Sequence, residues 1–206
     1  MWYLAVLAAV ISYLLGNLNG AVIVSTLIAH DDVRNHGSGN AGLTNFIRNY
    51  GASRSLLVIA IDVLKAVLAC LLGGLMFPEY AIAGRTLGGV CVMLGHDFPA
   101  LQGFRGGKGI LSGWFIAFMI DWRVGVLIAI VFFTAYLLTQ YVSLGSILSA
   151  ATFGIGFIYF YPHDILVIAG TTFMSLLTIF QHRQNLIRLL KGQERKTNLL
   201  SKGKKK

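Results

Sequence analysis

The sequence contains few charged residues, few acidic residues and few cysteines. Asp, Glu, Lys and Arg make up 12% of its 206 residues, about half of the ~25% that soluble globular domains carry. Hydrophobic residues make up 56%, and the mean hydropathy is +0.71. This composition excludes an ordinary soluble domain and predicts an all-α, polytopic integral membrane protein. Because no second composition marks a soluble part, we expect residues 1–206 to form a single membrane-embedded domain.

Several chemical signatures are absent. The two cysteines, Cys70 and Cys91, lie in apolar runs without a Cys-x-x-Cys pair or a nearby histidine, so we interpret them as small buried hydrophobic residues. The eight acidic residues form no cluster able to hold Mg²⁺, which argues against nucleotide-lipid transferases. No histidine begins a His-x-x-x-x-Asp pair, and there is no Gly-x-Ser-x-Gly. We expect no metal and no cofactor.

The apolar residues form seven segments, which predict about seven transmembrane helices. The third and fourth segments are shorter than the ~17–25 residues that a crossing usually needs. The first has no basic region ahead of it, so we expect a retained helix and not a cleaved signal. The segments are Trp2 to Ala29, Ser55 to Phe77, Ala81 to Gly95, Gly109 to Ile120, Val124 to Thr139, Leu144 to Tyr161, and Ile165 to Gln181.

Basic residues set the expected orientation. The formal net charge is +9, and the bases gather after Gln181, where residues 193–206 form a basic tail with Glu194 as its one acid. The positive-inside rule places this tail in the cytoplasm, beside anionic lipid. Seven crossings then put the N-terminus outside. Nucleic-acid binding is disfavoured because no aromatic residue is interleaved with the bases.

Two features inside the apolar segments have structural interpretations. Gly84 and Gly88 form a GxxxG pattern, which predicts close helix packing. Asp62 and Lys65 lie one helical turn apart, which predicts an intrahelical ion pair near the inner face. A role for Lys65 in charge balance at a site stays open.

The first of three polar stretches is Gly37-Ser38-Gly39-Asn40-Ala41-Gly42-Leu43-Thr44-Asn45-Phe46-Ile47-Arg48. Its Gly-x-Gly-x-x-Gly string follows a membrane segment and not a strand, so a dinucleotide fold is rejected. Close backbone N–H groups, hydroxyls, amides and the Arg48 guanidinium suit an anion, especially if Thr44 to Arg48 begins a helix. A glycine-rich turn with a capping Thr44 remains the alternative.

The second stretch runs from Gly95-His96-Asp97-Phe98-Pro99 to Phe104-Arg105-Gly106-Gly107-Lys108-Gly109. It is not a nucleotide P-loop, since that pattern requires Gly where Gln102 stands and Ser or Thr where Gly109 stands. Three glycines around Lys108 still favour an anion-binding turn over a topological anchor. His96 and the neighbouring Asp97 are expected to form structural hydrogen bonds rather than bind a metal.

The third stretch runs from His182 to Gly192. His182 and Asn185 are three residues apart, which predicts that they share one helix face. With Arg188 they are expected to extend the last apolar segment into the cytoplasm. His182 is either an interfacial cap or a functional group, and its neighbours resemble the polar residues of the other two stretches.

These motifs resemble the bacterial acyl-phosphate:glycerol-3-phosphate acyltransferase family over nearly the whole chain. The matching residues are Gly37-Ser38-Gly39-Asn40-x-Gly42-x-Thr44-Asn45-x-x-Arg48, Asp62-x-x-Lys65, Gly95-His96-x-x-Pro99, Phe104-x-Gly106-Gly107-Lys108-Gly109, Ser143-x-Gly145-Ser146, and His182-Arg183-x-Asn185-x-x-Arg188-Leu189-x-x-Gly192-x-Glu194. The chain departs from the family pattern at Gly16-Asn17-Leu18-Asn19, Ala41 and Ser112.

The resemblance implies seven helices, a bacterial inner-membrane location and an active site at the cytoplasmic face. It implies acyl transfer from acyl phosphate to the 1-hydroxyl of glycerol 3-phosphate, giving lysophosphatidic acid and phosphate. Glycerol 3-phosphate would be held by Arg48, Lys108, Ser38, His182 and Asn185. The donor phosphate would be held by backbone N–H groups near Gly106 and Gly107, with Thr44 and Asn45.

Lys108, Ser38, His182 and Asn185 are the expected catalytic residues, and His182 is the one candidate protein base. The donor is already activated, so the protein needs two anion sites and no covalent nucleophile. The partners are the two substrates and membrane lipid, without nucleic acid. A membrane transporter of a phosphorylated metabolite is the main alternative, although the sequence shows no internal repeat.

Overall fold

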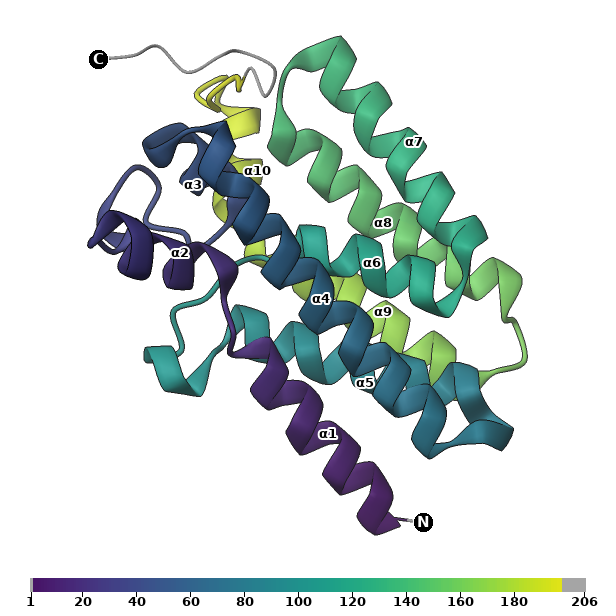
Figure 1. Cartoon of the computed structure of the whole chain (residues 1–206). Coiled ribbons are helices and arrows are strands. Elements are labelled where there is room, and N and C mark those ends of the chain that lie inside the picture. The colour runs from purple at the N-terminus through teal and green to yellow at the C-terminus, as the bar shows by residue number, and fades with distance from the viewer. Residues whose placement is uncertain (1, 198–206) are drawn as a thin grey trace.

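A computed structural model of the chain describes residues 2–197, and these residues form helices and loops without a strand. Figure 1 shows the helices as a bundle with shorter elements at one end. The helices are α1 (Trp2–Gly16), α2 (Gly20–Ala29), α3 (Leu43–Tyr50), α4 (Ala52–Met76), α5 (Ala81–Asp97), α6 (Ile110–Ile120), α7 (Trp122–Thr139), α8 (Val142–Phe160), α9 (Ile165–Gln181) and α10 (Arg183–Leu190), with short 3₁₀ turns at Val33–Asn35, Pro78–Tyr80 and Ala100–Gln102.

The first apolar segment, expected to be a retained helix, is broken into two helices within one candidate span. α1 ends at Gly16 and α2 begins at Gly20. Asn19 caps the new helix, because its side-chain oxygen accepts a hydrogen bond from Val22 N at 3.1 Å. The polar residues that interrupt the apolar run therefore end one helix and begin the next, with Asn19 as the cap of α2.

The described helices include membrane-spanning lengths. Taken across its short break, Trp2–Ala29 is apolar enough to cross a bilayer, as are Ala52–Met76, Trp122–Thr139 and Val142–Phe160. A fifth span results if α9 and α10, bent by 53°, are counted as one. α5 has 17 residues and α6 has 11. The chain is therefore a helical membrane protein, while seven crossings remain a prediction.

Glycines bring α4 and α5 into backbone contact. A Cβ at Gly84 would collide with the carbonyl group of Gly73, and a Cβ at Gly88 would collide with that of Ala69. The packing interpretation of the GxxxG pattern is therefore confirmed. The predicted ion pair on α4 is also confirmed, since Lys65 Nζ lies 2.7 Å from Asp62 Oδ1 with both side chains almost fully buried.

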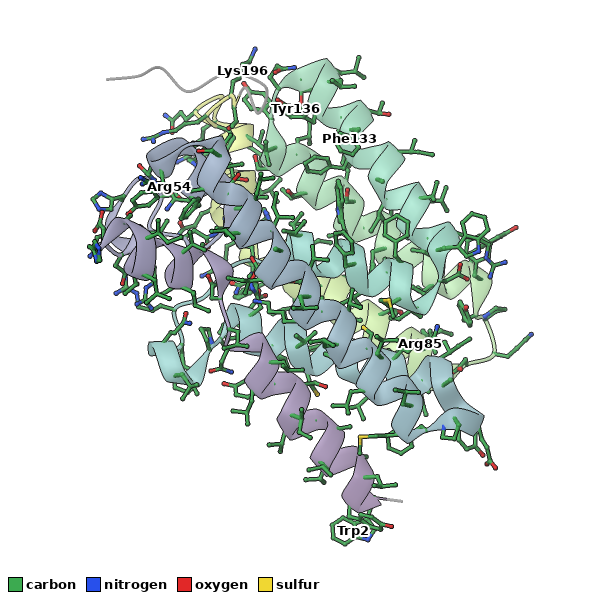
Figure 2. All side chains as sticks on the ribbon, in the orientation of Figure 1. Trp2, Arg54, Arg85, Phe133, Tyr136 and Lys196 are labelled. Carbon is green, nitrogen blue, oxygen red and sulfur yellow. The ribbon has the colours of Figure 1, made fainter. Side chains whose placement is uncertain are left out.

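The polar elements collect at one end of the bundle. α2, α3 and α10 lie together there, near the connection between α7 and α8 (Figure 1). Figure 2 shows Arg54 and Lys196 toward this end and Trp2 at the opposite end of the molecule. We refer to it as the polar end. Its position relative to the two faces of the membrane remains a prediction.

Candidate active site

A cavity of about 500 Å³ opens at the polar end. The three polar stretches meet in it although they are far apart in the sequence. Seven of the nine predicted site residues line it: Ser38, Thr44, Asn45, Arg48, Lys108, His182 and Asn185. Gly106 and Gly107 do not. The prediction that the three stretches converge is thus correct in its geometry.

Asn45 shapes the first loop from within. Its side-chain nitrogen donates to the carbonyl oxygens of Val33, His36 and Asn40 at 3.0–3.1 Å, and its oxygen accepts from Ser38 N at 3.1 Å. Both halves of the amide are therefore occupied by the loop itself. The expectation that Asn45 holds a phosphate directly is corrected: its side chain fixes the loop that presents Ser38.

The N-terminus of α3 faces the cavity. Gly42 is the N-cap residue, and Gly42, Leu43 and Thr44 all line the cavity. The first N–H groups of a helix have no partner within it and carry partial positive charge. Thr44 to Arg48 does lie within a helix, as the anion-site interpretation requires. This helix end therefore offers an anion site next to the Thr44 hydroxyl.

Hydrogen bonds join the first and second loops to each other and to the helix break. Arg34 Nη1 donates to the carbonyl oxygen of Gln102 at 2.8 Å. Asn19 Nδ2 donates to the Ala41 carbonyl oxygen at 3.0 Å, and Ala41 N donates to that of Gly106 at 3.4 Å. The loops are consequently held as one unit around the cavity.

Lys108 extends from the second loop to the third stretch. Its ammonium group donates a hydrogen bond to Asn185 Oδ1. Burial lowers the pKa of Lys108 to about 8; the positive charges of Arg188 and Arg183 act in the same direction, and Glu194 acts against them. A bound anion would raise the pKa of Lys108 again, because a nearby negative charge stabilises the ammonium form. The site is therefore suited to an anionic ligand.

Gly106 and Gly107 support the Lys108 turn and do not face the cavity. Gly107 N donates to the His96 carbonyl oxygen at 3.0 Å, so this N–H is not free for a ligand. A Cβ at Gly106 would collide with the carbonyl oxygen of His96. The Gly107 N–H is therefore engaged with the end of α5, and the role of the backbone N–H groups near Gly106 and Gly107 in holding the donor phosphate stays a prediction.

His182 lies at the bend between α9 and α10. Its Nδ1 is 2.8 Å from the carbonyl oxygen of Thr178, one helical turn earlier. A carbonyl oxygen can only accept a hydrogen bond, so the proton resides on Nδ1 and the neutral ring leaves Nε2 as an acceptor. His182 is the C-cap residue of α9 and also lines the cavity, and its role as a functional group stays a prediction.

Glu194 and Ser143 also line the cavity, although neither was among the predicted site residues. Glu194 Oε1 accepts from Asn185 Nδ2 at 2.9 Å and from Ser143 Oγ at 3.0 Å, and Oε2 accepts from Arg188 Nε at 2.7 Å. Burial raises the pKa of Glu194, but these three donors outweigh it and hold the pKa below its usual value. Both residues belong to the family pattern, which was the available signal.

The first residues of the predicted basic tail fold back over the polar end. Thr197 N donates to the Gln140 carbonyl oxygen at 3.1 Å, and Tyr136 Oη donates to the Thr197 carbonyl oxygen at 3.0 Å. Arg48 donates a hydrogen bond to Thr197 Oγ1. The tail's placement beside anionic lipid stays a prediction, and residues 198–206 lie outside the described part of the chain.

Part of the cavity lining is apolar. Leu111 and Trp114 of α6 and Phe132 and Phe133 of α7 line it. The rings of Trp114 and Phe132 meet edge to face with centroids 4.8 Å apart, and Figure 2 places Phe133 on α7 close to the polar end. The cavity thus joins a cationic, hydrogen-bonding region to an aromatic and aliphatic one.

Comparison with known proteins identifies relatives of this arrangement. A sequence model of glycerol-3-phosphate acyltransferases matches residues 6–192. The glycerol-3-phosphate acyltransferase of Thermoanaerobacter sp. (strain X514) is 40% identical over 192 residues, covering 93% of this chain and 95% of the relative. That of Bacillus subtilis (strain 168) is 35% identical over 199 residues, covering 96% and 100%.

Solved structures of an integral membrane acyltransferase have the same fold. The crystal structure of PlsY (YgiH), an integral membrane glycerol 3-phosphate acyltransferase, in its glycerol 3-phosphate form superposes with a TM-score of 0.86 at 30% identity, covering 95% of this chain and 96% of that one. Its lysophosphatidic acid form gives 0.82 at 29% identity. The cavity, the motifs around it and these matches together show that the chain belongs to the glycerol-3-phosphate acyltransferase family of integral membrane enzymes.

Proposed function

We propose that this enzyme transfers a fatty acyl group from an acyl phosphate to the 1-hydroxyl of glycerol 3-phosphate, with lysophosphatidic acid and inorganic phosphate as products. The observation that carries the proposal is the mixed lining of the cavity, in which Arg48 and Lys108 occur together with Trp114 and Phe133. The cationic side chains suit two phosphate groups, and the apolar side chains suit a fatty acyl chain.

Glycerol 3-phosphate binds, in this proposal, between Arg48, Lys108 and Ser38, with Asn185 and His182 beside its glycerol hydroxyls. A guanidinium fork can bind two phosphate oxygens at once, and an ammonium adds a further charge-assisted hydrogen bond. The Arg48–Thr197 and Lys108–Asn185 hydrogen bonds would be exchanged for bonds to the substrate phosphate.

The donor phosphate is assigned to the N-terminus of α3. The free N–H groups of the first helical turn and the Thr44 hydroxyl are proposed alongside the groups near Gly106 and Gly107 that the sequence predicts. This assignment gives the two phosphates different groups in one cavity, so the acceptor hydroxyl and the acyl carbon can approach each other.

The reaction requires no covalent enzyme intermediate. The 1-hydroxyl oxygen attacks the acyl carbonyl carbon, the bond from that carbon to the phosphate oxygen breaks, and phosphate leaves with the bonding electrons. The hydroxyl proton passes to His182 Nε2, the acceptor fixed by the Thr178 contact, or to the departing phosphate. Lys108, Ser38 and Asn185 would stabilise the charge that develops on the reacting oxygens.

We further propose seven crossings in a bacterial inner membrane, with the N-terminus outside and the cavity at the cytoplasmic face. The distribution of bases supports this orientation, because Arg34, Arg48, Arg54 and Lys108 lie on the side assigned inside. The separation of Trp2 from Arg54 and Lys196 in Figure 2 is consistent with it.

A transporter of a phosphorylated metabolite is the rival proposal. The test is to incubate the purified protein in detergent with palmitoyl phosphate and glycerol 3-phosphate and to quantify products. Lysophosphatidate and phosphate released in equal amounts support acyl transfer. Uptake of unchanged glycerol 3-phosphate into protein-containing vesicles, without lysophosphatidate, would support the transporter instead.

A further inference from the structure

A cluster of three ionisable side chains with little exposure lies next to the Lys108 turn, and two of them, Asp62 and His96, also line the cavity. Lys65 Nζ is 2.7 Å from Asp62 Oδ1 and 2.8 Å from His96 Nδ1, and it also donates to the Leu18 carbonyl oxygen at 2.9 Å. The side chains of Asp62, Lys65 and His96 are 3%, 1% and 6% exposed. The proposed mechanism gives none of them a role, although burying such groups is costly.

The cluster fixes the orientation and tautomer of the imidazole. Lys65 is surrounded by acceptors, among them the carboxylate of Asp62, so its ammonium donates to His96 Nδ1. The proton of the neutral ring therefore resides on Nε2. Asp62 is held in turn by the backbone N–H of Gly20, 3.1 Å from Oδ1. The ring consequently cannot rotate without breaking this buried hydrogen-bond network.

The other edge of the ring meets the turn that carries Lys108. A Cβ built on Gly107 would collide with His96 Nε2 and would lie 2.9 Å from both Cδ2 and Cε1, so the imidazole abuts Gly107 end-on. The Gly107 N–H is bonded to the carbonyl oxygen of the same histidine at 3.0 Å. His96 thus contacts Gly107 with both its backbone and its ring, one residue before Lys108.

We propose that His96 is a positioning residue for Lys108, with the Asp62–Lys65 pair holding the imidazole as a rigid support under Gly107. The backbone at Gly107 sets the starting point of the Lys108 side chain, and a displacement of ~1 Å at a reacting group can cost ~100-fold in rate. This inference rests on the proposed role of Lys108 in binding glycerol 3-phosphate.

The primary test is His96→Asn in two backgrounds. Asparagine keeps an acceptor near the position of Nδ1 for Lys65 but removes the ring edge at Gly107. We expect a thermal unfolding temperature close to that of the parent, a roughly tenfold or larger rise in KM for glycerol 3-phosphate, and a matching loss of affinity for this substrate. In the Lys108→Ala background, His96→Asn should cause no further loss of affinity or residual turnover.

The proposal is overturned if His96→Asn has the KM of the parent. It is also overturned if His96→Asn lowers the affinity for glycerol 3-phosphate by the same factor with and without Lys108. The two failures stay distinguishable, because normal turnover of Lys108→Ala alone rejects the proposed function, whereas an additive His96 effect rejects only the positioning role. Thr86→Val, on the same helix α5 but outside the cavity, is the matched control and should behave as the parent.

A second test uses the close contact between Gly107 and the His96 ring. Gly107→Ala places a methyl group against the imidazole and should raise KM for glycerol 3-phosphate. Removing the ring edge with His96→Asn should then relieve part of this defect, so that the double variant loses less than the product of the two single losses. Independent, multiplicative losses would show that Gly107 and His96 do not act through their contact and would contradict the proposal.

Discussion

Lys108 and Asn185, which are 77 residues apart in the chain, are joined by a hydrogen bond from the lysine ammonium to the asparagine oxygen. Asn185 in turn donates to Glu194, which also accepts from Ser143 and Arg188. A single network therefore links the second polar stretch to the third and to the start of α8. The lysine has a flexible stem, so its ammonium group can exchange Asn185 for a phosphate.

Lys108→Ala should lower kcat/KM for glycerol 3-phosphate by ~100-fold or more, because charge-assisted hydrogen bonds contribute ~1.5–3 kcal/mol each and the substrate loses both charge and contact. Steady-state kinetics with the purified variant gives the value, and size-exclusion chromatography in detergent reports folding. Arg105→Ala is the control, since Arg105 is exposed on the same loop and does not line the cavity. Near-normal turnover of Lys108→Ala would remove Lys108 from the site.

Arg48→Lys should raise KM for glycerol 3-phosphate by ~10-fold while keeping the positive charge, because an ammonium cannot reproduce a guanidinium fork on two phosphate oxygens. The same change should leave the thermal unfolding temperature nearly unaltered. Measured affinity for glycerol 3-phosphate equal to that of the parent would show that recognition at Arg48 is not bidentate.

Activity should fall at alkaline pH. The pKa of Lys108 is lowered to about 8, so the free enzyme carries the ammonium below that pH and loses it above. Since the charged form binds phosphate, kcat/KM for glycerol 3-phosphate should decline as pH rises through about 8. Lys108→Arg, whatever its absolute rate, should shift this decline to higher pH. An unchanged decline in Lys108→Arg would assign the titration to another group.

Glu194→Gln should reduce the free energy of unfolding by ~1–3 kcal/mol, because the carboxylate accepts from three partners that an amide cannot all satisfy. The lowered pKa of Glu194 also predicts how the stability of the protein changes in acid. Stability from Glu194 is fully present above its unperturbed value of 4.5 and is lost as pH falls through the lower pKa of the folded state. Thermal unfolding of Glu194→Gln and of the exposed control Gln193→Ala, compared at neutral and acid pH, measures both effects.

The sequence predicted the helical membrane class and most of the cavity. Hydropathy was sufficient for the class, and polar residues at the ends of apolar segments were sufficient to bring Ser38, Lys108 and His182 together. Asn17 and Asn19 were harder to interpret, because an apolar run interrupted by two asparagines fits either a continuous span or two helices. Only the cap that Asn19 forms with Val22 decides between them.

The roles of Gly107 and Glu194 depended on tertiary contacts that local pattern does not contain. Gly107 was expected to offer its N–H to a ligand, but the end of α5 lies close enough to take it. The sequence pattern predicts that Glu194 is a single acid in a basic tail. In the fold it accepts a hydrogen bond from Ser143, which lies 51 residues earlier in the chain. Both cases required the packing of distant helices to be known.

The choice of acyl donor distinguishes the proposed reaction from acyl transfer out of a thioester. The purified enzyme would receive glycerol 3-phosphate with palmitoyl phosphate in one reaction and with palmitoyl-CoA in a parallel one, with lysophosphatidate as the product quantified. We predict product from the acyl phosphate, with inorganic phosphate released in equal amount, and none from the thioester. Lysophosphatidate formed from palmitoyl-CoA alone would contradict the account.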